Sequence, residues 1–153
     1  MALKKIAVYT TLLLSLFLFF SCENNSSSIE GTWILTDYTH LGYSFDDSFV
    51  ETGTSSNYGV VIIFDGNLMT STGSFDLYME TTVSGETESM VYQGQTFHMG
   101  QSAWNIERDY LFIGPNERGF FIDYQGSSLI LRDEYTTETK RVIKEIVLEK
   151  KSD

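Results

Sequence analysis

The sequence predicts an all-β fold, either an antiparallel sandwich or a closed barrel, built from about eight to ten short strands. Apolar runs of strand length alternate with turn residues at near-regular spacing from Ile29 to Lys150. No stretch keeps the long, clean apolar period of 3.6 residues that an amphipathic helix requires. The chain also has 12 glycines and only 1 proline, and it is rich in Thr, Tyr, Phe, Val and Ile, which favour strands.

Residues 1–21 predict a signal peptide that is removed on export. Met1–Lys5 carries two lysines, and the apolar stretch Ile6–Phe20 has about fifteen residues, whereas a membrane-spanning helix needs roughly twenty. Ser21 supplies the small residue before the predicted cleavage point. Two alternatives remain open for this segment, an uncleaved signal anchor and plain secretion.

Cys22 is the only cysteine of the chain, so no disulfide can form within it. Exported proteins mostly use cysteines in pairs, and a lone one needs another explanation. The stretch Leu18–Cys22 resembles the lipobox of bacterial lipoproteins, although Phe19 and Phe20 stand where leucine and a small residue are most common. The resemblance implies that Cys22 becomes the mature N-terminus and carries acyl chains, palmitate among them, on its sulfur and its amine.

The polar residues Glu23–Ser28 predict a flexible tether that reaches about 20 Å when extended, which would hold the domain close to the lipid surface. We therefore expect a signal peptide at 1–21, a lipidated cysteine and tether at 22–28, a β-domain at 29–150 and a tail at 151–153. The expected partner is a membrane of the cell envelope, reached through lipid on Cys22. The outer membrane is favoured, and the periplasmic or surface face stays open.

The chain is strongly acidic, with 21 Asp and Glu against 10 Lys and Arg and a net charge of −11. Lys4 and Lys5 belong to the expected signal peptide, so the mature chain would be more acidic still. A protein that binds polyanions needs clustered Lys and Arg. Nucleic acid is therefore excluded as an expected partner.

The first expected strand is Ile29–Tyr38, whose alternation places Trp33 and Leu35 on one face and Tyr38 on the other, together with Thr32, Ile34 and Thr36. Residues 39–57 are the least regular part of the chain. We expect them to form a short strand or a loop that covers one end of the fold.

Tyr58–Phe64 is the most apolar run and predicts a central strand buried on both faces or beside the core. Asp65-Gly66-Asn67 predicts a tight hairpin to a returning strand at 68–73, because Asp-Gly tolerates positive φ. A further strand is expected at 74–83, followed by a turn at 84–86 and with one face formed by Phe75, Leu77, Met79 and Thr81.

The remaining elements alternate strand and turn. Strands at 88–92 and 96–99 flank an expected turn at 93–95, and later strands are expected at 103–107, 110–113, 120–125, 129–135 and 140–150. The last of them also has apolar residues at helical spacing, but its β-branched residues and its alternation favour a strand.

Several short motifs occur in an order that resembles the lipocalin-like lipoproteins of Bacteroidota. They are Gly31-Thr32-Trp33, Phe64-Asp65-Gly66, Trp104 ahead of Leu111, the hairpin around Leu129 and Leu131, and the terminal Leu148-Glu149-Lys150. The resemblance implies a small antiparallel up-and-down β-barrel. It also implies that Trp33 closes one barrel end against a basic residue, for which the candidates are Arg132, Arg141 and Lys150.

The candidate binding residues are large side chains expected to point inward, namely Trp33, Phe64, Trp104, Phe120, Ile122 and Tyr124. They could line a pocket for a small apolar ligand, or they could fill the core. An eight-stranded barrel is just wide enough for either arrangement.

No residue pattern indicates catalysis, a metal or a cofactor. His40 and His98 lack metal-ligand spacing, and the acidic pairs Asp46-Asp47 and Asp133-Glu134 lack the spacing of a calcium loop. Two functions remain open, and neither is enzymatic. One is a module that holds a small hydrophobic or amphipathic molecule. The other is a structural or protein-interaction lipoprotein with a filled barrel, whose partners the sequence does not identify.

Overall fold

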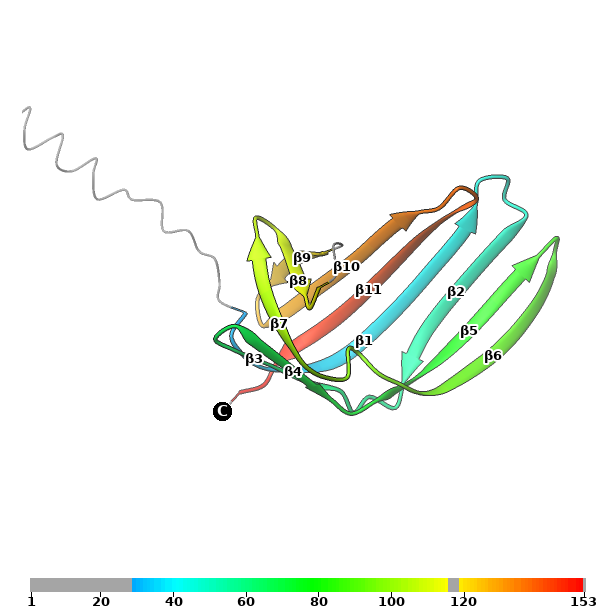
Figure 1. Ribbon diagram of the computed structural model, residues 1–153. Helices are drawn as coiled ribbons and strands as arrows, with labels where there is room; N and C mark the ends of the chain where they lie inside the picture. Colours follow the sequence, from blue (N-terminus) through cyan, green and yellow to red (C-terminus); the bar gives the residue numbers. More distant parts are fainter. Residues whose placement is uncertain (1–28, 116–118, 153) are drawn as a thin grey trace, which may run out of the picture.

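The computed structural model describes residues 29–115 and 119–152. The expectations for the signal peptide, for Cys22 and for the tether concern residues outside this part of the chain. Within it, the chain forms eleven strands and no helix (Figure 1). The strands are β1 (Gly31–Ser44), β2 (Phe49–Ser56), β3 (Val61–Asp65), β4 (Leu68–Thr72), β5 (Phe75–Val83), β6 (Glu86–Gln95), β7 (Gly100–Glu107), β8 (Tyr110–Ile113), β9 (Phe120–Gln125), β10 (Ser128–Thr136) and β11 (Lys140–Lys150).

Eight of these strands close into an antiparallel barrel, in the order β1, β3, β4, β7, β8, β9, β10 and β11. Closure follows because β11 pairs with β1 as well as with β10. The all-β fold and the small antiparallel barrel predicted from the sequence are confirmed, and the sandwich is excluded. The final segment is strand β11, so its helical alternative is also excluded.

Three further strands continue the sheet away from the barrel. The first half of β1, Gly31–Ile34, pairs with β3, whereas its second half, Thr39–Tyr43, pairs with β2 on the same side. Strand β2 then pairs with β5, and β5 pairs with β6. We call strands β2, β5 and β6 the extension (Figure 1).

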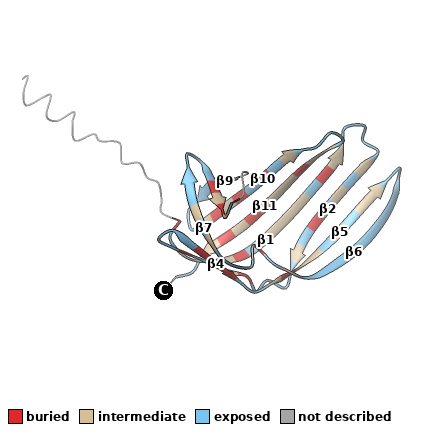
Figure 2. Cartoon of the chain, in the orientation of Figure 1, coloured by how far each residue is buried: buried red, intermediate tan, exposed pale blue. Residues whose placement is uncertain are grey.

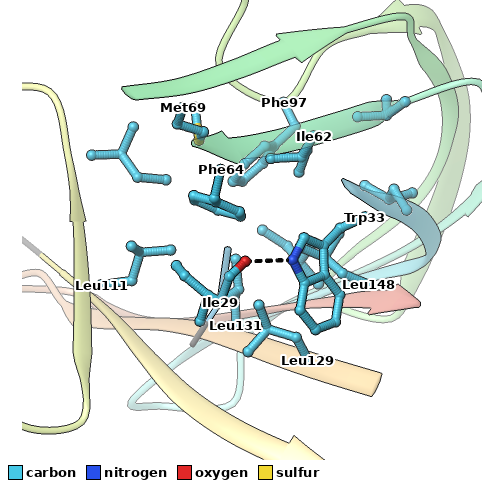
Figure 3. Close-up of a cluster of buried hydrophobic side chains, with 14 of the residues drawn as sticks. Ile29, Trp33, Ile62, Phe64, Met69, Phe97, Leu111, Leu129, Leu131 and Leu148 are labelled. Atoms are coloured by element: carbon cyan, nitrogen blue, oxygen red, sulfur yellow. Dashed lines mark hydrogen bonds between the residues drawn. The ribbon is translucent and has the colours of Figure 1, made fainter. Parts of the chain in front are cut away.

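The hydrophobic core lies inside the barrel. All eight barrel strands contribute side chains to it, and Figure 3 shows how the central ones converge. Phe97, from the segment between β6 and β7, also enters this cluster. The buried members are Ile29, Trp33, Leu35, Val60, Ile62, Phe64, Met69, Phe75, Phe97, Leu111, Ile113, Ile122, Leu129, Leu131, Ile146 and Leu148.

A β-bulge in β1 corrects the predicted orientation of Tyr38. The register with β11 shifts between Leu35 and Asp37, so that Leu35 opposes Leu148 while Tyr38 opposes the buried Ile146. The extra residue reverses the alternation that follows it. Tyr38 therefore lies on the same face as Trp33, and the prediction that it lies opposite was wrong.

Residues 39–57 do not form a loop across the barrel end. They complete β1 and form β2, with a short turn between them. Of the two alternatives for 58–64, burial on both faces is excluded and a place beside the core is confirmed, because Ile62 and Phe64 are buried while Ile63 is 41% exposed. This strand forms a wall with one face in the core and the other in solvent.

The turn predicted at 93–95 was wrong as well. Strand β6 runs without interruption from Glu86 to Gln95, and its register with β5 becomes irregular only near Gly94, where φ is positive. The strand expected at 96–99 is irregular in structure, and its Phe97 is in the core.

Candidate functional site

The candidate binding residues are not all placed alike. Trp33, Phe64 and Ile122 are buried in the core, and Trp104 and Phe120 pack against it. Tyr124 instead remains 36% exposed. One ring pair lies within this group, since Phe64 lies edge-on to Trp104 at 5.3 Å between centroids. A second pair joins Phe120 to the core residue Phe97, with 5.9 Å between centroids.

Trp33 is held at one end of the barrel by two contacts. Its indole Nε1 donates a hydrogen bond of 2.7 Å to the carbonyl of Ile29, drawn as the dashed line in Figure 3. The Lys150 ammonium lies 5.5 Å from the ring centroid. Arg132 and Arg141, the other two basic candidates, form ion pairs with Glu145 and Glu134 instead.

The inner wall of the barrel continues directly onto the extension. Residues opposite each other in register lie on the same face, and His40, Gly53, Met79 and Met90 form one such row across four strands. We call this the inner face of the extension. Its side chains on the three strands come from Phe49, Glu51, Ser55, Leu77, Met79, Thr81, Val83, Glu86, Glu88, Met90 and Tyr92.

A polar cluster lies on the inner face where the extension joins the barrel. Glu51 Oε1 is 2.5 Å from His40 Nε2 and 3.6 Å from Lys140 Nζ. The side chains of His40 and Glu51 are only 11% and 15% exposed. The Lys140 ammonium also lies 5.3 Å from the ring centroid of Phe49, which completes a compact group of charged and aromatic residues.

Aromatic hydroxyls adjoin this cluster on the barrel side. The pKa of Tyr38 is raised to about 12, chiefly because its hydroxyl is removed from water and also because Tyr135 and Asp133 are nearby. Lys144 lies 5.6 Å from the ring centroid of Tyr135. Tyr38 is therefore a neutral phenol near pH 7, and its surroundings oppose its use as a base.

The two acidic pairs noted in the sequence have separate structural roles. Asp46 accepts hydrogen bonds from the hydroxyls of Ser44 and Ser48, at 2.6 and 2.7 Å, and these hold the pKa of its carboxyl at about 2. It thereby shapes the turn between β1 and β2. Asp133 is buried on the inner side of β10, and its neighbour Glu134 pairs with Arg141. Strand alternation separates the two carboxyls.

Residues 29–115 and 119–152 contain neither a cluster of metal-binding side chains nor a helix that could span a membrane. In this part of the chain no three His, Cys, Asp or Glu side chains are grouped to hold a metal ion. The same residues include no helix with the length and hydropathy needed to cross a membrane. His40 contacts Glu51, and His98 contacts the hydroxyl of Ser102.

The extension exposes apolar side chains on both of its faces. Val83, Met90 and Tyr92 on the inner face are 51%, 57% and 45% exposed, and Val91 on the outer face is 55% exposed. Figure 2 shows β6 exposed along almost its whole length. A shallow hollow of about 470 Å³ lies on the inner face near the β5–β6 turn, lined by Thr81, Val83, Ser84, Glu86 and Glu88.

Sequence reasoning missed the extension as a candidate site. Alternation marks which residues share a face, but it cannot show whether a second layer covers that face. One compositional signal was present: no Lys or Arg occurs between Ile6 and Glu107. The comparisons with known proteins add no assignment, because no family model, no curated protein and no solved structure matches this chain.

Proposed function

We propose that this chain is a lipid-anchored protein-interaction domain of the cell envelope, with a lipocalin-like barrel as its scaffold and the extension as its binding surface. It acts without catalysis. The observation that supports this proposal is the single-layer extension, whose strands expose apolar side chains on both faces.

Exposure of the apolar side chains of the extension to water is energetically unfavourable. Two- or three-stranded sheets need a packed face for stability, and soluble monomers rarely expose contiguous apolar patches. Val83, Met90 and Tyr92 lie together on one face, with Val91 and Tyr78 on the other. A protein partner that covers these side chains would gain the apolar area that the extension leaves in solvent.

The packed barrel favours an interaction protein over a carrier of small molecules. Side chains from all eight strands meet in the interior, and five of the six candidate pocket residues belong to or pack against that cluster. The volume expected for an apolar ligand is thus used by the protein's own side chains. The polar cluster around Glu51 instead stiffens the junction from which the extension projects.

Lipid on Cys22 gives this surface its location. The tether predicted at Glu23–Ser28 would keep the barrel near the membrane, while the acidic chain disfavours contact with anionic head groups. Cys22→Ala is expected to leave the membrane fraction. Retention of this variant after an alkaline wash would contradict the anchor.

Site-specific photo-crosslinking in intact cells tests the function. A photoreactive residue is placed at the half-buried Met79 or at the exposed Tyr78, on the two faces of the extension, and at Ile63 on the barrel wall, which is as exposed as Tyr78. We expect a discrete adduct with another protein from both extension positions, none from Ile63, and loss of the adduct when Cys22 is replaced.

Equal labelling from the extension and from Ile63 would count against the proposal, and so would no adduct at all. Native mass spectrometry of the detergent-solubilised full chain supplies an independent check. A stoichiometric small molecule that survives purification would favour the ligand-binding alternative instead.

A further inference from the structure

The outer edge of β6 is open. Strand β6 is the last strand of the sheet, and no strand among the described residues pairs with its far side. It is ten residues long, with regular register from Glu86 to Tyr92. An edge of this length presents a row of unpaired backbone donors and acceptors.

The β5–β6 hairpin shows which backbone groups face outward. Val83 and Glu86 flank a two-residue turn at Ser84 and Gly85, whose φ values are both positive, 51° and 88°. In such a type I′ hairpin the flanking residues exchange both hydrogen bonds. Backbone hydrogen bonds to β5 then recur at every second residue of β6, namely Glu86, Glu88, Met90 and Tyr92. The N–H and C=O groups of Thr87, Ser89 and Val91 therefore point away from β5.

From Ser89 onward this edge lacks the usual features that prevent strand addition, and its charges on the inner face are confined to Glu86 and Glu88. Natural edges are protected by Lys, by Pro or by charges that point inward. Strand β6 has neither Lys nor Pro, and its residues from Ser89 to Gln95 carry no charge. Its only irregularity, at Gly94, lies beyond the seven regular residues.

The negative charge of the extension favours a basic strand as the one that pairs with β6. Its three strands and the β1–β2 turn contain no Lys or Arg, and their acidic residues are Asp46, Asp47, Glu51, Asp76, Glu80, Glu86 and Glu88. A second copy would bring the same carboxyl groups and no cation. A strand that carries Lys or Arg would be electrostatically complementary.

The hollow beside the β5–β6 turn supplies a specific place for one basic side chain. Val83 offers an exposed apolar surface for the aliphatic stem, and Glu86 and Glu88 offer carboxyl groups to the cation. Two residues further along the same face, Met90 and Tyr92 are exposed and suit apolar neighbours.

We propose that β6 accepts an extended segment of a partner protein as a twelfth strand, with a Lys or Arg of that segment beside Glu86 and Glu88 and apolar residues beside Met90 and Tyr92. This inference rests on the proposed function and names the partner's chemistry. Backbone hydrogen bonds give affinity, and the pattern of cation followed by apolar residues gives selectivity.

The test uses the full chain in detergent and a synthetic peptide, Lys-Thr-Lys-Thr-Val-Thr-Val-Tyr, whose lysines and valines lie on one face. The peptide is N-methylated at alternate residues, which blocks one edge and prevents its self-association. Amide hydrogen exchange is then followed at single residues. Exchange at Thr87, Ser89 and Val91 is expected to slow by about tenfold or more, while Glu88 and Met90 change little because β5 already protects them.

Two control peptides separate backbone pairing from charge. A peptide N-methylated on both edges should give no protection. A peptide with Glu in place of Lys should bind about tenfold more weakly at low salt, and the difference should shrink as salt screens the charges. Equal protection by the Lys and Glu peptides would overturn the basic-partner assignment.

Val91→Pro is the matched variant. Proline removes an N–H that β5 does not use, so the edge strand should keep its fold, whereas the added strand loses a donor. Near-ultraviolet circular dichroism of Trp33 and Trp104 verifies the barrel. Glu86→Gln with Glu88→Gln is the second variant and should remove the preference for the Lys peptide.

Two further outcomes would overturn the inference. In one, Thr87, Ser89 and Val91 become protected without peptide as protein concentration rises, which assigns the edge to a second copy. In the other, no peptide protects them. Crosslinks from Met79 and Tyr78 that persist in Val91→Pro would leave the proposed function intact while removing this mode of binding.

Discussion

The ammonium group of Lys150 lies 5.5 Å from the ring centroid of Trp33, across the pairing of the first and last strands of the barrel. The same indole donates a hydrogen bond to the carbonyl of Ile29. One aromatic side chain thus links the start of the domain to its end, where β1 and β11 close the barrel.

Replacing Trp33 should therefore weaken the barrel more than removing the cation beside it. Trp33→Phe loses the bond to Ile29 and part of the buried ring, and we expect a loss of about 2 kcal/mol in the free energy of unfolding. Lys150→Met should cost about 0.5 kcal/mol, because the exposed cation contributes little. Urea denaturation measures both, with Lys151→Met as a control. Equal effects of Lys150→Met and Lys151→Met would contradict the contact.

Gly73→Ala should be among the most damaging small substitutions. Gly73 has a φ of 84°, and a Cβ there would lie 1.9 Å from the carbonyl oxygen of Gly59. Backbone strain and a backbone clash act together, so we expect a loss of about 3 kcal/mol or more. Gly85→Ala is the matched control, since its φ is 88° but no atom lies within 4 Å of the added carbon. It should cost about 1 kcal/mol. Thermal or urea unfolding that ranks the two alike would contradict the steric argument.

Glu51→Gln should destabilise the junction between barrel and extension. The carboxyl of Glu51 faces His40 and Lys140 and is mostly shielded from water. Removing its charge leaves the Lys140 ammonium and the His40 ring with a weaker acceptor. We expect the free energy of unfolding to fall by about 1–2 kcal/mol. Glu80→Gln, on an exposed residue of β5, should change stability by less than about 0.5 kcal/mol. Both losses are measured by urea denaturation. Equal losses in the two variants would contradict a stabilising role for the contacts of Glu51 with His40 and Lys140.

The raised pKa of Tyr38 should make the folded chain less stable at high pH. Its pKa is raised from 10.0 to about 12 in the folded chain, so above pH 10 the unfolded chain loses the phenolic proton first. Stability from this group is complete below pH 10 and declines as pH rises toward about 12. Because Tyr38 is partly exposed, we expect the decline to be about 1 kcal/mol.

Tyr38→Phe is expected to lose less stability than the unmodified chain between pH 10 and about 12. Urea denaturation at several pH values gives the difference, which cancels the titration of lysines common to both proteins. Tyr43→Phe serves as a comparison at another tyrosine of β1. Identical pH profiles for Tyr38→Phe and the unmodified chain would contradict the assignment.

Local patterns predicted most strands of the barrel. The Asp65-Gly66 turn, the alternation in 120–125 and the terminal strand all occur as expected, because each depends on residues close together in sequence. Tyr38 was placed on the wrong face because a bulge depends on pairing with β11, more than a hundred residues away. The turn expected at Gly94 failed for a related reason, since pairing with β5 extends β6 through it.

The sequence by itself determined the β class, the number of strands to within a few, the acidity of the region without Lys or Arg, and the presence of Trp33 with a basic residue near the C-terminus. These features follow from composition and from neighbours along the chain. Tertiary structure alone decided that Lys150 is the residue beside Trp33, that the candidate pocket residues pack into a core, and that β2, β5 and β6 leave the barrel as a single layer. Each of these depends on which strands pair across long separations, and that choice is made by the folded sheet as a whole.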